Sequence, residues 1–237
     1  MNNPAATVSL PEGVSLARVG QVLLDAWEVG FHQWETSPLQ LREGDAPASP
    51  APLPCDAMEL FRLLHLAKVP YLLVGGIAML TYVQGRNTKD VDLLMSVSAM
   101  AHVPELKVLN REDCFVRGSF RTLQVDLLLT SNPLFQTVQE RFATKHRFAE
   151  LEVPAVSVEG LIVLKLYALP SLFRQLDWDR VYVYESDIKQ LLARYQPDVE
   201  PLLALLKPHV LPSDLGEMRK LIDEERERRS RASKSRG

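Results

Sequence analysis

The residues best suited to chemistry are three aspartates that lie within apolar segments. Asp90 and Asp92 occur as Asp-Val-Asp before a Leu-Leu-Met run, and Asp126 occurs within Val-Asp-Leu-Leu-Leu. If these segments are strands, side chains alternate between the two faces, so Asp90 and Asp92 share one face. Like charges held together repel and lose hydration, and a hard cation such as Mg²⁺ would compensate for both costs. Three carboxylates on neighbouring strands could therefore hold two metal ions for an in-line displacement at phosphorus.

A glycine pair and an Arg-x-Thr segment precede these aspartates. Gly75 and Gly76 follow an apolar Tyr-Leu-Leu-Val segment, and backbone without Cβ atoms can approach triphosphate oxygens closely. Arg86 and Thr88 lead into the Asp-x-Asp, where Arg86 either contacts a phosphate or forms an ion pair at the strand end. A second Asp-x-Asp, at 177–179, is expected to be a solvated turn. In series with the carboxylates, the glycine pair indicates nucleotide binding.

The composition is that of an ordinary soluble globular protein. The chain has 237 residues, of which 46% are hydrophobic and 24% charged, and its net charge is −3. Its two cysteines form no metal-ligand motif and suit a reducing, cytoplasmic location. No apolar run reaches the ~18 residues of a membrane span, so no membrane partner is expected. RNA binding would need a local basic patch. Candidates for it are Arg86, Lys89, Arg117, Arg121, Lys145 and Arg147.

Hydrophobic patterning predicts the elements that position these residues. An amphipathic helix is expected at 15–34, which is either core or a partner contact, followed by a proline-rich linker at 36–54. A helix from Asp56 should direct Met58, Phe61, Leu64 and Leu66 inward. Strands are predicted at 71–74, 90–97, 114–120, 122–129 and 147–151. Helices are predicted at 75–83, 99–106 and 132–142, after a Ser157 cap, and at 184–195, 198–206 and 214–229. The basic tail from Glu217 is expected to be a solvated helix end that frays into the Ser-Arg-Lys terminus.

These elements define an α+β fold. We expect a small mixed or antiparallel sheet flanked by helices at 56–150, which would be the catalytic domain. The N-terminal helix and linker at 1–55 precede it, and a helical C-terminal domain with a basic tail follows at 151–237. This arrangement would carry all three aspartates on the sheet.

The motifs, taken in order, resemble those of the nucleotidyltransferase superfamily of the polymerase-β type. A closer resemblance, over about residues 58–195, is to the AbiEii/MenT-like nucleotidyltransferases of toxin–antitoxin and abortive-infection systems. The motifs that carry it are Val74-Gly75-Gly76, Arg86-x-Thr88-x-Asp90-x-Asp92, Val125-Asp126-Leu127, Leu164-Lys165-Leu166 and Ser186-Asp187-Ile188. The sequence departs from the family pattern by an insertion at 175–185, which affects the alignment of Arg174 and Asp187.

The resemblance implies a role for each motif. Asp90 and Asp92 would ligate two Mg²⁺ ions, and Asp126 would complete the site and help to activate an acceptor hydroxyl. The nucleoside triphosphate would be bound by Gly75, Gly76, Arg86, Thr88, Lys165 and Asp187. Within that set Lys165 would neutralise phosphate charge, and Asp187 would support it or the nucleotide. Without the resemblance, Lys165 would be interpreted as a surface lysine whose stem lies along an apolar helix.

The function implied is transfer of a nucleoside monophosphate from an NTP to an acceptor hydroxyl, with release of pyrophosphate. The acceptor would be an RNA 3′ end, such as that of tRNA, or a protein side chain, and the enzyme would be a toxin with a protein antitoxin as partner. One alternative is transfer to a small molecule of the aminoglycoside type. Another is a nucleotide-binding or RNA-binding module without catalysis.

Overall fold

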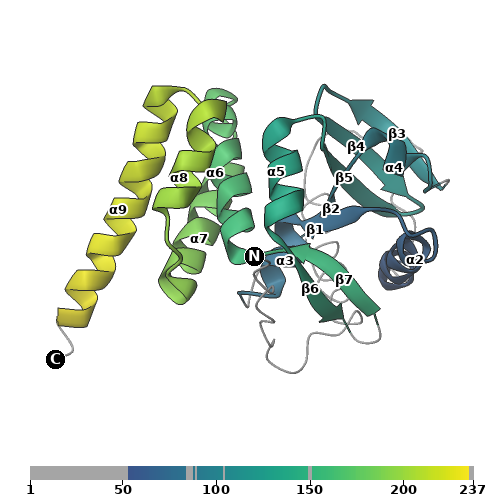
Figure 1. The fold of residues 1–237 in the computed structure, drawn as a ribbon, viewed down its shortest axis with the longest axis horizontal. Coiled ribbons are helices and arrows are strands. Elements are labelled where there is room, and N and C mark those ends of the chain that lie inside the picture. The colour runs from purple at the N-terminus through teal and green to yellow at the C-terminus, as the bar shows by residue number, and fades with distance from the viewer. Residues whose placement is uncertain (1–52, 84–87, 89, 104, 149–150, 235–237) are drawn as a thin grey trace, which may run out of the picture. The chain divides into compact units, whose positions relative to one another are not determined.

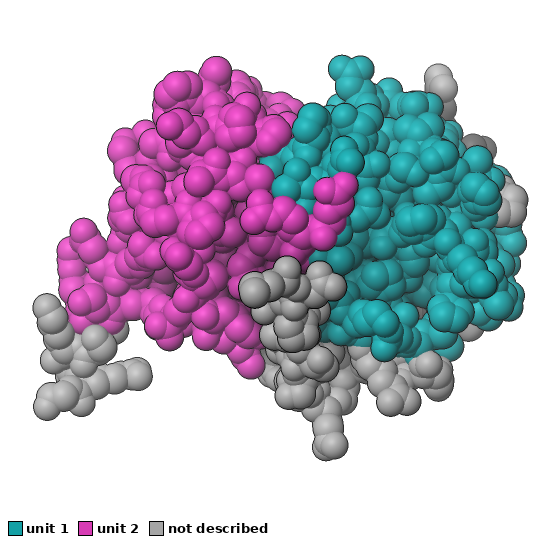
Figure 2. Space-filling view, in the orientation of Figure 1, with its two compact units in different colours: residues 1–139, 143–155 teal, residues 140–142, 156–237 magenta. Residues whose placement is uncertain are grey.

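The computed structural model describes residues 53–83, 88, 90–103, 105–148 and 151–234. The predicted helix at 15–34 and nearly all of the linker at 36–54 lie outside these ranges. The chain divides into two compact units (Figure 2), Met1–Gln139 with Ala143–Ala155, and Glu140–Phe142 with Val156–Gly237. None of the helices in the described part is both long and apolar enough to cross a membrane.

A seven-stranded mixed sheet forms the centre of the first unit's described part (Figure 1). Its strands are β1 (Tyr71–Val74), β2 (Asp90–Met95), β3 (Leu106–Arg111), β4 (Phe115–Phe120), β5 (Leu123–Leu129), β6 (Ala143–Phe148) and β7 (Leu151–Val156). Their order is β3-β4-β5-β2-β1-β7-β6, with β2 parallel to β5, β1 parallel to β7, and antiparallel pairs β1–β2, β4–β5 and β3–β4. The predicted α+β class with a small mixed sheet is confirmed.

The register of the central strands separates an apolar row from a polar one. Leu73, Leu93, Leu127 and Val116 are partners across β1, β2, β5 and β4, and each is at most 1% exposed. Burying such a row stabilises the sheet, because each side chain of this size contributes roughly 1.5–3 kcal/mol when removed from water. The neighbouring row, one residue along each strand, therefore points to the opposite face.

Helix α2 (Leu53–Leu66) covers part of the sheet through an apolar face and a buried carboxylate. Phe61 and Leu64 are buried as predicted, whereas Met58 and Leu66 are exposed, so their predicted inward direction is wrong. The helix is oriented by Asp56, which is 4% exposed and accepts hydrogen bonds from Thr122 N–H at 3.2 Å and from its hydroxyl at 2.5 Å. This contact ties α2 to the turn before β5.

Three further helices accompany the described strands: α3 (Gly75–Leu80), α4 (Val97–Met100) and α5 (Pro133–Arg141). The predicted helix at 99–106 ends early, because the chain continues into β3, an edge strand that pairs along β4. The predicted strand at 147–151 is instead two strands, β6 and β7. On β6, buried His146 lies with Nε2 2.8 Å from the hydroxyl of Tyr82.

The described part of the second unit from residue 157 onward is helical. It comprises α6 (Val158–Arg174), α7 (Trp178–Tyr195), α8 (Glu200–Leu206), a 3₁₀ turn (Lys207–His209) and α9 (Pro212–Lys234). Ser157 caps α6, as predicted. The second Asp-x-Asp is solvated as predicted but begins a helix: Asp177 caps α7 by accepting a hydrogen bond from Arg180 N–H, and Asp179 is exposed in its first turn. The predicted helix at 214–229 is present as α9, which continues to Lys234, and its Met218 and Ile222 are buried.

Candidate metal centre

The sheet register brings the predicted aspartates together. Asp92 on β2 is the partner of Asp126 on β5, and Asp126 is in turn the partner of Arg117 on β4. Val74 on β1 is the partner of Asp92 on its other side. Asp90, two residues earlier on β2, faces the same side as Asp92, while Val91 between them is buried. The alternation predicted for Asp90 and Asp92 is thus present.

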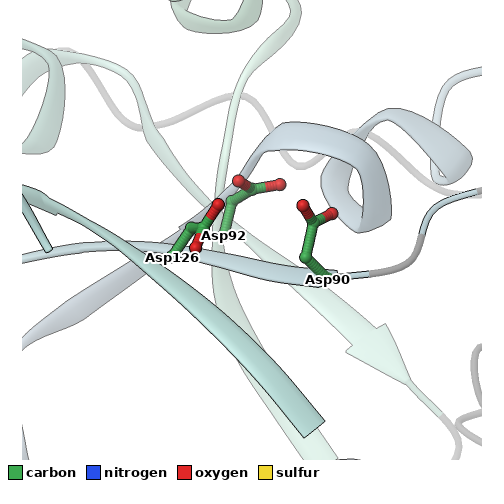
Figure 3. A group of neighbouring side chains, drawn as sticks. All are labelled: Asp90, Asp92 and Asp126. Carbon is green, nitrogen blue, oxygen red and sulfur yellow. The ribbon is translucent and has the colours of Figure 1, made fainter. Parts of the chain in front are cut away.

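The three carboxylates converge on one point (Figure 3). One oxygen from each of Asp90, Asp92 and Asp126 lies within 4.8 Å of the others. Asp126 is only 4% exposed, and the other two are half-buried. Within the described residues this is the group of acids, histidines or cysteines whose geometry could hold a metal ion. An all-oxygen, anionic donor set suits a hard divalent cation such as Mg²⁺ or Mn²⁺.

Asp90 and Asp92 are each oriented by a neutral donor from the preceding segment. The Thr88 hydroxyl, in a residue that is 7% exposed, donates to Asp90 Oδ1 at 2.9 Å. The Gly76 N–H donates to Asp92 Oδ2 at 3.1 Å. Hydrogen bonds of this kind fix the direction in which a ligand oxygen points. The motif residues before Asp-x-Asp therefore support the carboxylates themselves.

The glycine pair is required by close packing against the same carboxylates. Gly75 has φ +62°, in the left-handed region, and a Cβ atom there would overlap the carboxylate of Asp92. A Cβ atom on Gly76 would overlap the hydroxyl of Thr88. Sequence reasoning assigned the pair to a triphosphate and missed this function. The predicted contact with phosphate remains a prediction.

Asp126 is held by two side chains that the sequence analysis did not assign to the site. Arg117 Nε and one terminal nitrogen donate to its two oxygens at 3.3 and 3.5 Å. The Gln124 amide donates to both oxygens at 3.3 Å. The β4–β5 hairpin offered a signal for this arrangement, because the pairing of Phe120 with Leu123 places Arg117 opposite Asp126.

Lys165 and Asp187 meet each other within the second unit. Lys165 Nζ on α6 lies 2.7 Å from Asp187 Oδ2 on α7, and both side chains are 4% exposed. The ammonium also lies 4.3 Å from the centre of the Tyr184 ring, a cation–π contact. The alternative of a lysine that reaches the surface is therefore wrong. The predicted insertion at 175–185 forms the turn after α6 and the beginning of α7.

The remaining predicted residues are either paired elsewhere or outside the described ranges. Arg174 ends α6 and pairs with Asp214 at 3.2 Å. Arg86 lies outside the described residues. Several members of the predicted basic patch form intramolecular ion pairs: Arg117 with Asp126, Arg121 with Glu105 and Asp56, and Lys145 with Glu152. The Arg121–Glu105 and Lys145–Glu152 pairs are exposed, and such pairs exchange partners at little cost.

Comparison with solved structures finds weak similarities to nucleotidyltransferases and a nucleotidyltransferase-like protein. The solution structure of the antibiotic-resistance factor ANT(2'')-Ia has a TM-score of 0.48 at 13% identity, covering 65% of this chain and 89% of that one. A crystal structure of ANT(2'')-Ia with adenylyl-2''-tobramycin gives 0.48 at 13% identity, covering 69% and 94%. An antigenic nucleotidyltransferase-like protein from Paracoccidioides brasiliensis gives 0.43 at 15% identity, covering 69% and 89%.

No family model matches the chain, and no curated protein matches it. At TM-scores of 0.43 to 0.48 the structural likeness carries no argument of its own. What the protein does must therefore be inferred from the geometry of its own residues.

Proposed function

We propose that the protein is a metal-dependent nucleotidyltransferase that moves a nucleoside monophosphate from an NTP to an acceptor hydroxyl. The observation that carries this proposal is the convergence of Asp90, Asp92 and Asp126 from two strands paired in register. Two Mg²⁺ ions held by these carboxylates would stabilise the charge on the attacking and leaving oxygens at the α-phosphorus. The donor set fits these ions because it is anionic, composed of oxygen and partly buried.

The reaction is a displacement at the α-phosphorus. The acceptor oxygen forms a bond to that phosphorus while the bond to the β-phosphate bridge oxygen breaks, and pyrophosphate leaves. The proton of the acceptor hydroxyl passes to the carboxylate of Asp126, to which the Gln124 amide donates hydrogen bonds. Asp90 and Asp92 remain ionised as ligands, each oriented by its own donor.

The groups proposed to bind the triphosphate are those that the family resemblance implies. Gly75 and Gly76, at the start of α3, and Arg86 and Thr88 would bind it beside the carboxylates. Lys165 would neutralise phosphate charge and Asp187 would support it, which requires the ion pair between them to open or to be shared. A purely structural ion pair is the competing interpretation, and the NTP affinity of the folded Asp187→Asn variant separates the two, because a purely structural pair would leave that affinity unchanged.

The acceptor and the biological role extend the same proposal. The resemblance to AbiEii/MenT-like enzymes favours an RNA 3′ end, such as that of tRNA, or a protein side chain as acceptor. It also favours a cytoplasmic toxin with a protein antitoxin. Aminoglycoside-type small molecules are the alternative acceptor class, and binding of a nucleotide or RNA without catalysis is the alternative from outside enzymology.

The test is a labelling assay. The protein is incubated with Mg²⁺, each α-labelled NTP and either total RNA or an aminoglycoside mixture, and wild type is compared with Asp90→Asn. Asp179→Asn is the matched control, because it removes an exposed carboxylate from the other Asp-x-Asp. We expect label in an acceptor with wild type and the control, and none with Asp90→Asn. Absence of label from RNA, protein and small molecule, together with no Mg²⁺-dependent NTP binding, would overturn the proposal.

A further inference from the structure

Asp126 has a charged hydrogen-bond partner on the neighbouring strand. Asp90 and Asp92 accept hydrogen bonds from a hydroxyl and a backbone N–H, both neutral. Asp126 accepts from the guanidinium of Arg117 on the neighbouring strand, in addition to the Gln124 amide. The positive charge of Arg117 therefore lies directly beside a predicted metal ligand.

We propose that Arg117 is a positioning residue that holds Asp126 in the metal-free protein and lowers the affinity of the aspartate cluster for a divalent cation until a nucleotide arrives. This inference rests on the proposed function, because it concerns the same metal centre. A cation next to a metal site repels the metal, and it also competes for the carboxylate oxygens. A bound triphosphate would reverse this effect by supplying phosphate oxygens as a new partner for the guanidinium.

The contact geometry fits a guanidinium that can be displaced. The two hydrogen bonds measure 3.3 and 3.5 Å, which is longer than the roughly 2.7–2.9 Å typical of bonds between oppositely charged groups. The Arg117 side chain is 39% exposed, whereas that of Asp126 is 5% exposed. Strand pairing fixes both Cα positions, so displacement requires only rotation of the arginine side chain. Phe115, whose ring centre lies 5.9 Å from the guanidinium, provides a nearby surface for it.

The first experiment measures Mn²⁺ binding to the full-length protein without nucleotide, by calorimetry and by the electron paramagnetic resonance signal of free Mn²⁺. Removing the charge in Arg117→Gln should tighten binding by roughly 3- to 10-fold. Arg117→Lys, which keeps the charge, should bind within about 2-fold of wild type. Arg111→Gln is the matched control, because it removes an exposed arginine on β3 and should change nothing.

A second variant distinguishes the effect of the Arg117 charge from the effect of losing a hydrogen-bond donor that orients Asp126. Gln124→Ala removes a neutral donor to both Asp126 oxygens, so it should weaken Mn²⁺ binding or leave it unchanged. If Arg117 acted only as a support, Arg117→Gln would behave like Gln124→Ala, and that result would overturn the inference. Arg117→Met makes the same charge change with an apolar side chain, should the glutamine variant fail to fold.

Adding a non-hydrolysable NTP analogue completes the test. With the analogue present, we expect Arg117→Gln and wild type to bind Mn²⁺ with similar affinity, because the wild-type guanidinium then has a phosphate partner. If wild type binds Mn²⁺, Asp92→Asn abolishes the binding and Arg117→Gln has no effect, this inference fails while the metal centre stands. If no variant binds Mn²⁺ with or without the analogue, both this inference and the proposed function fail.

Discussion

The two units differ in how their buried charged side chains are arranged. On the sheet, Asp90, Asp92 and Asp126 place three like charges within reach of one another. In the helical unit, Lys165 and Asp187 form a buried pair of opposite charges. The two opposite charges of the pair compensate each other inside the fold, whereas the cluster sets three carboxylates beside the guanidinium of Arg117. An arrangement of three converging carboxylates is suited to a divalent cation from solution.

This difference predicts opposite consequences for the loss of one carboxylate. Removing one partner of a buried ion pair leaves a charge in a low-dielectric environment, which is strongly destabilising. Removing one of several like charges relieves repulsion and spares the fold. Loss of the carboxylate in the helical unit should therefore lower the free energy of unfolding, whereas loss of one on the sheet should lower activity with little change in that free energy.

Asp187→Asn is expected to have the largest effect. It leaves the buried Lys165 ammonium without its carboxylate, and we expect the free energy of unfolding to fall by about 3–5 kcal/mol. Urea denaturation followed by circular dichroism measures this loss. The double variant Lys165→Met/Asp187→Leu should recover most of it, because no buried charge remains. A single variant as stable as wild type would show that the pair is not buried in solution.

Asp92→Asn should lower the rate of nucleotide transfer by about 10²- to 10³-fold, because a metal ligand and its charge are lost. The free energy of unfolding should stay within about 0.5 kcal/mol of wild type or rise, since the Gly76 N–H keeps an oxygen partner. Single-turnover kinetics and urea denaturation measure the two quantities. A loss of stability as large as that of Asp187→Asn would remove the contrast between the units.

Mg²⁺ itself should stabilise the sheet unit through mass action. At a free concentration 100 times the Kd, the free energy of unfolding should rise by about 2.7 kcal/mol, and EDTA should remove the increase. Asp187→Asn should respond as wild type does, and Asp92→Asn should not respond. Differential scanning calorimetry across a Mg²⁺ series gives the measurement. An equal response in Asp92→Asn would place the ion elsewhere.

Thr88→Val tests the orientation of a single ligand. The substitution keeps the side-chain shape but removes the hydroxyl that donates to Asp90 Oδ1. We expect Mg²⁺ affinity to fall by about 10-fold, at the lower end of the range for groups that orient metal ligands. Thr137→Val on α5 is the matched control, because its exposed hydroxyl donates to a backbone carbonyl of its own helix. Equal affinities for both variants would exclude the positioning role of Thr88.

His146 should give the smallest effect and shows a third way to bury a polar group. Burial lowers its pKa below the ordinary value of 6.5, so the folded protein keeps the ring neutral where the unfolded chain takes up a proton. Stability is therefore fully present above pH 6.5 and declines as pH falls below it, by at most about 1.4 kcal/mol per pH unit. Denaturation at several pH values measures the slope, which His146→Gln should reduce.

The sequence predicted the elements with strong patterns and missed those set by neighbours. The bounds of Tyr71–Val74 are as predicted, because an apolar run ended by glycines is a local signal. The edge strand Leu106–Arg111 was missed because most of its side chains are exposed, and its partner strand supplies the pairing. The same reason applies to Arg117. Its position beside Asp126 follows from the register of the β4–β5 hairpin, which a sequence motif does not encode.

The in-register pairing of β2 with β5 also constrains how the sheet can assemble. A slip of one residue would set Asp92 opposite Val125 or Leu127 and would turn one strand's carboxylates into the apolar core. A carboxylate buried there without partners is far more costly than the repulsion among three aspartates at the polar face. The three aspartates therefore destabilise a sheet with slipped strands more than they destabilise the native sheet. Because the metal centre forms only when β2 and β5 are paired in register, metal binding would also report that these strands are correctly paired.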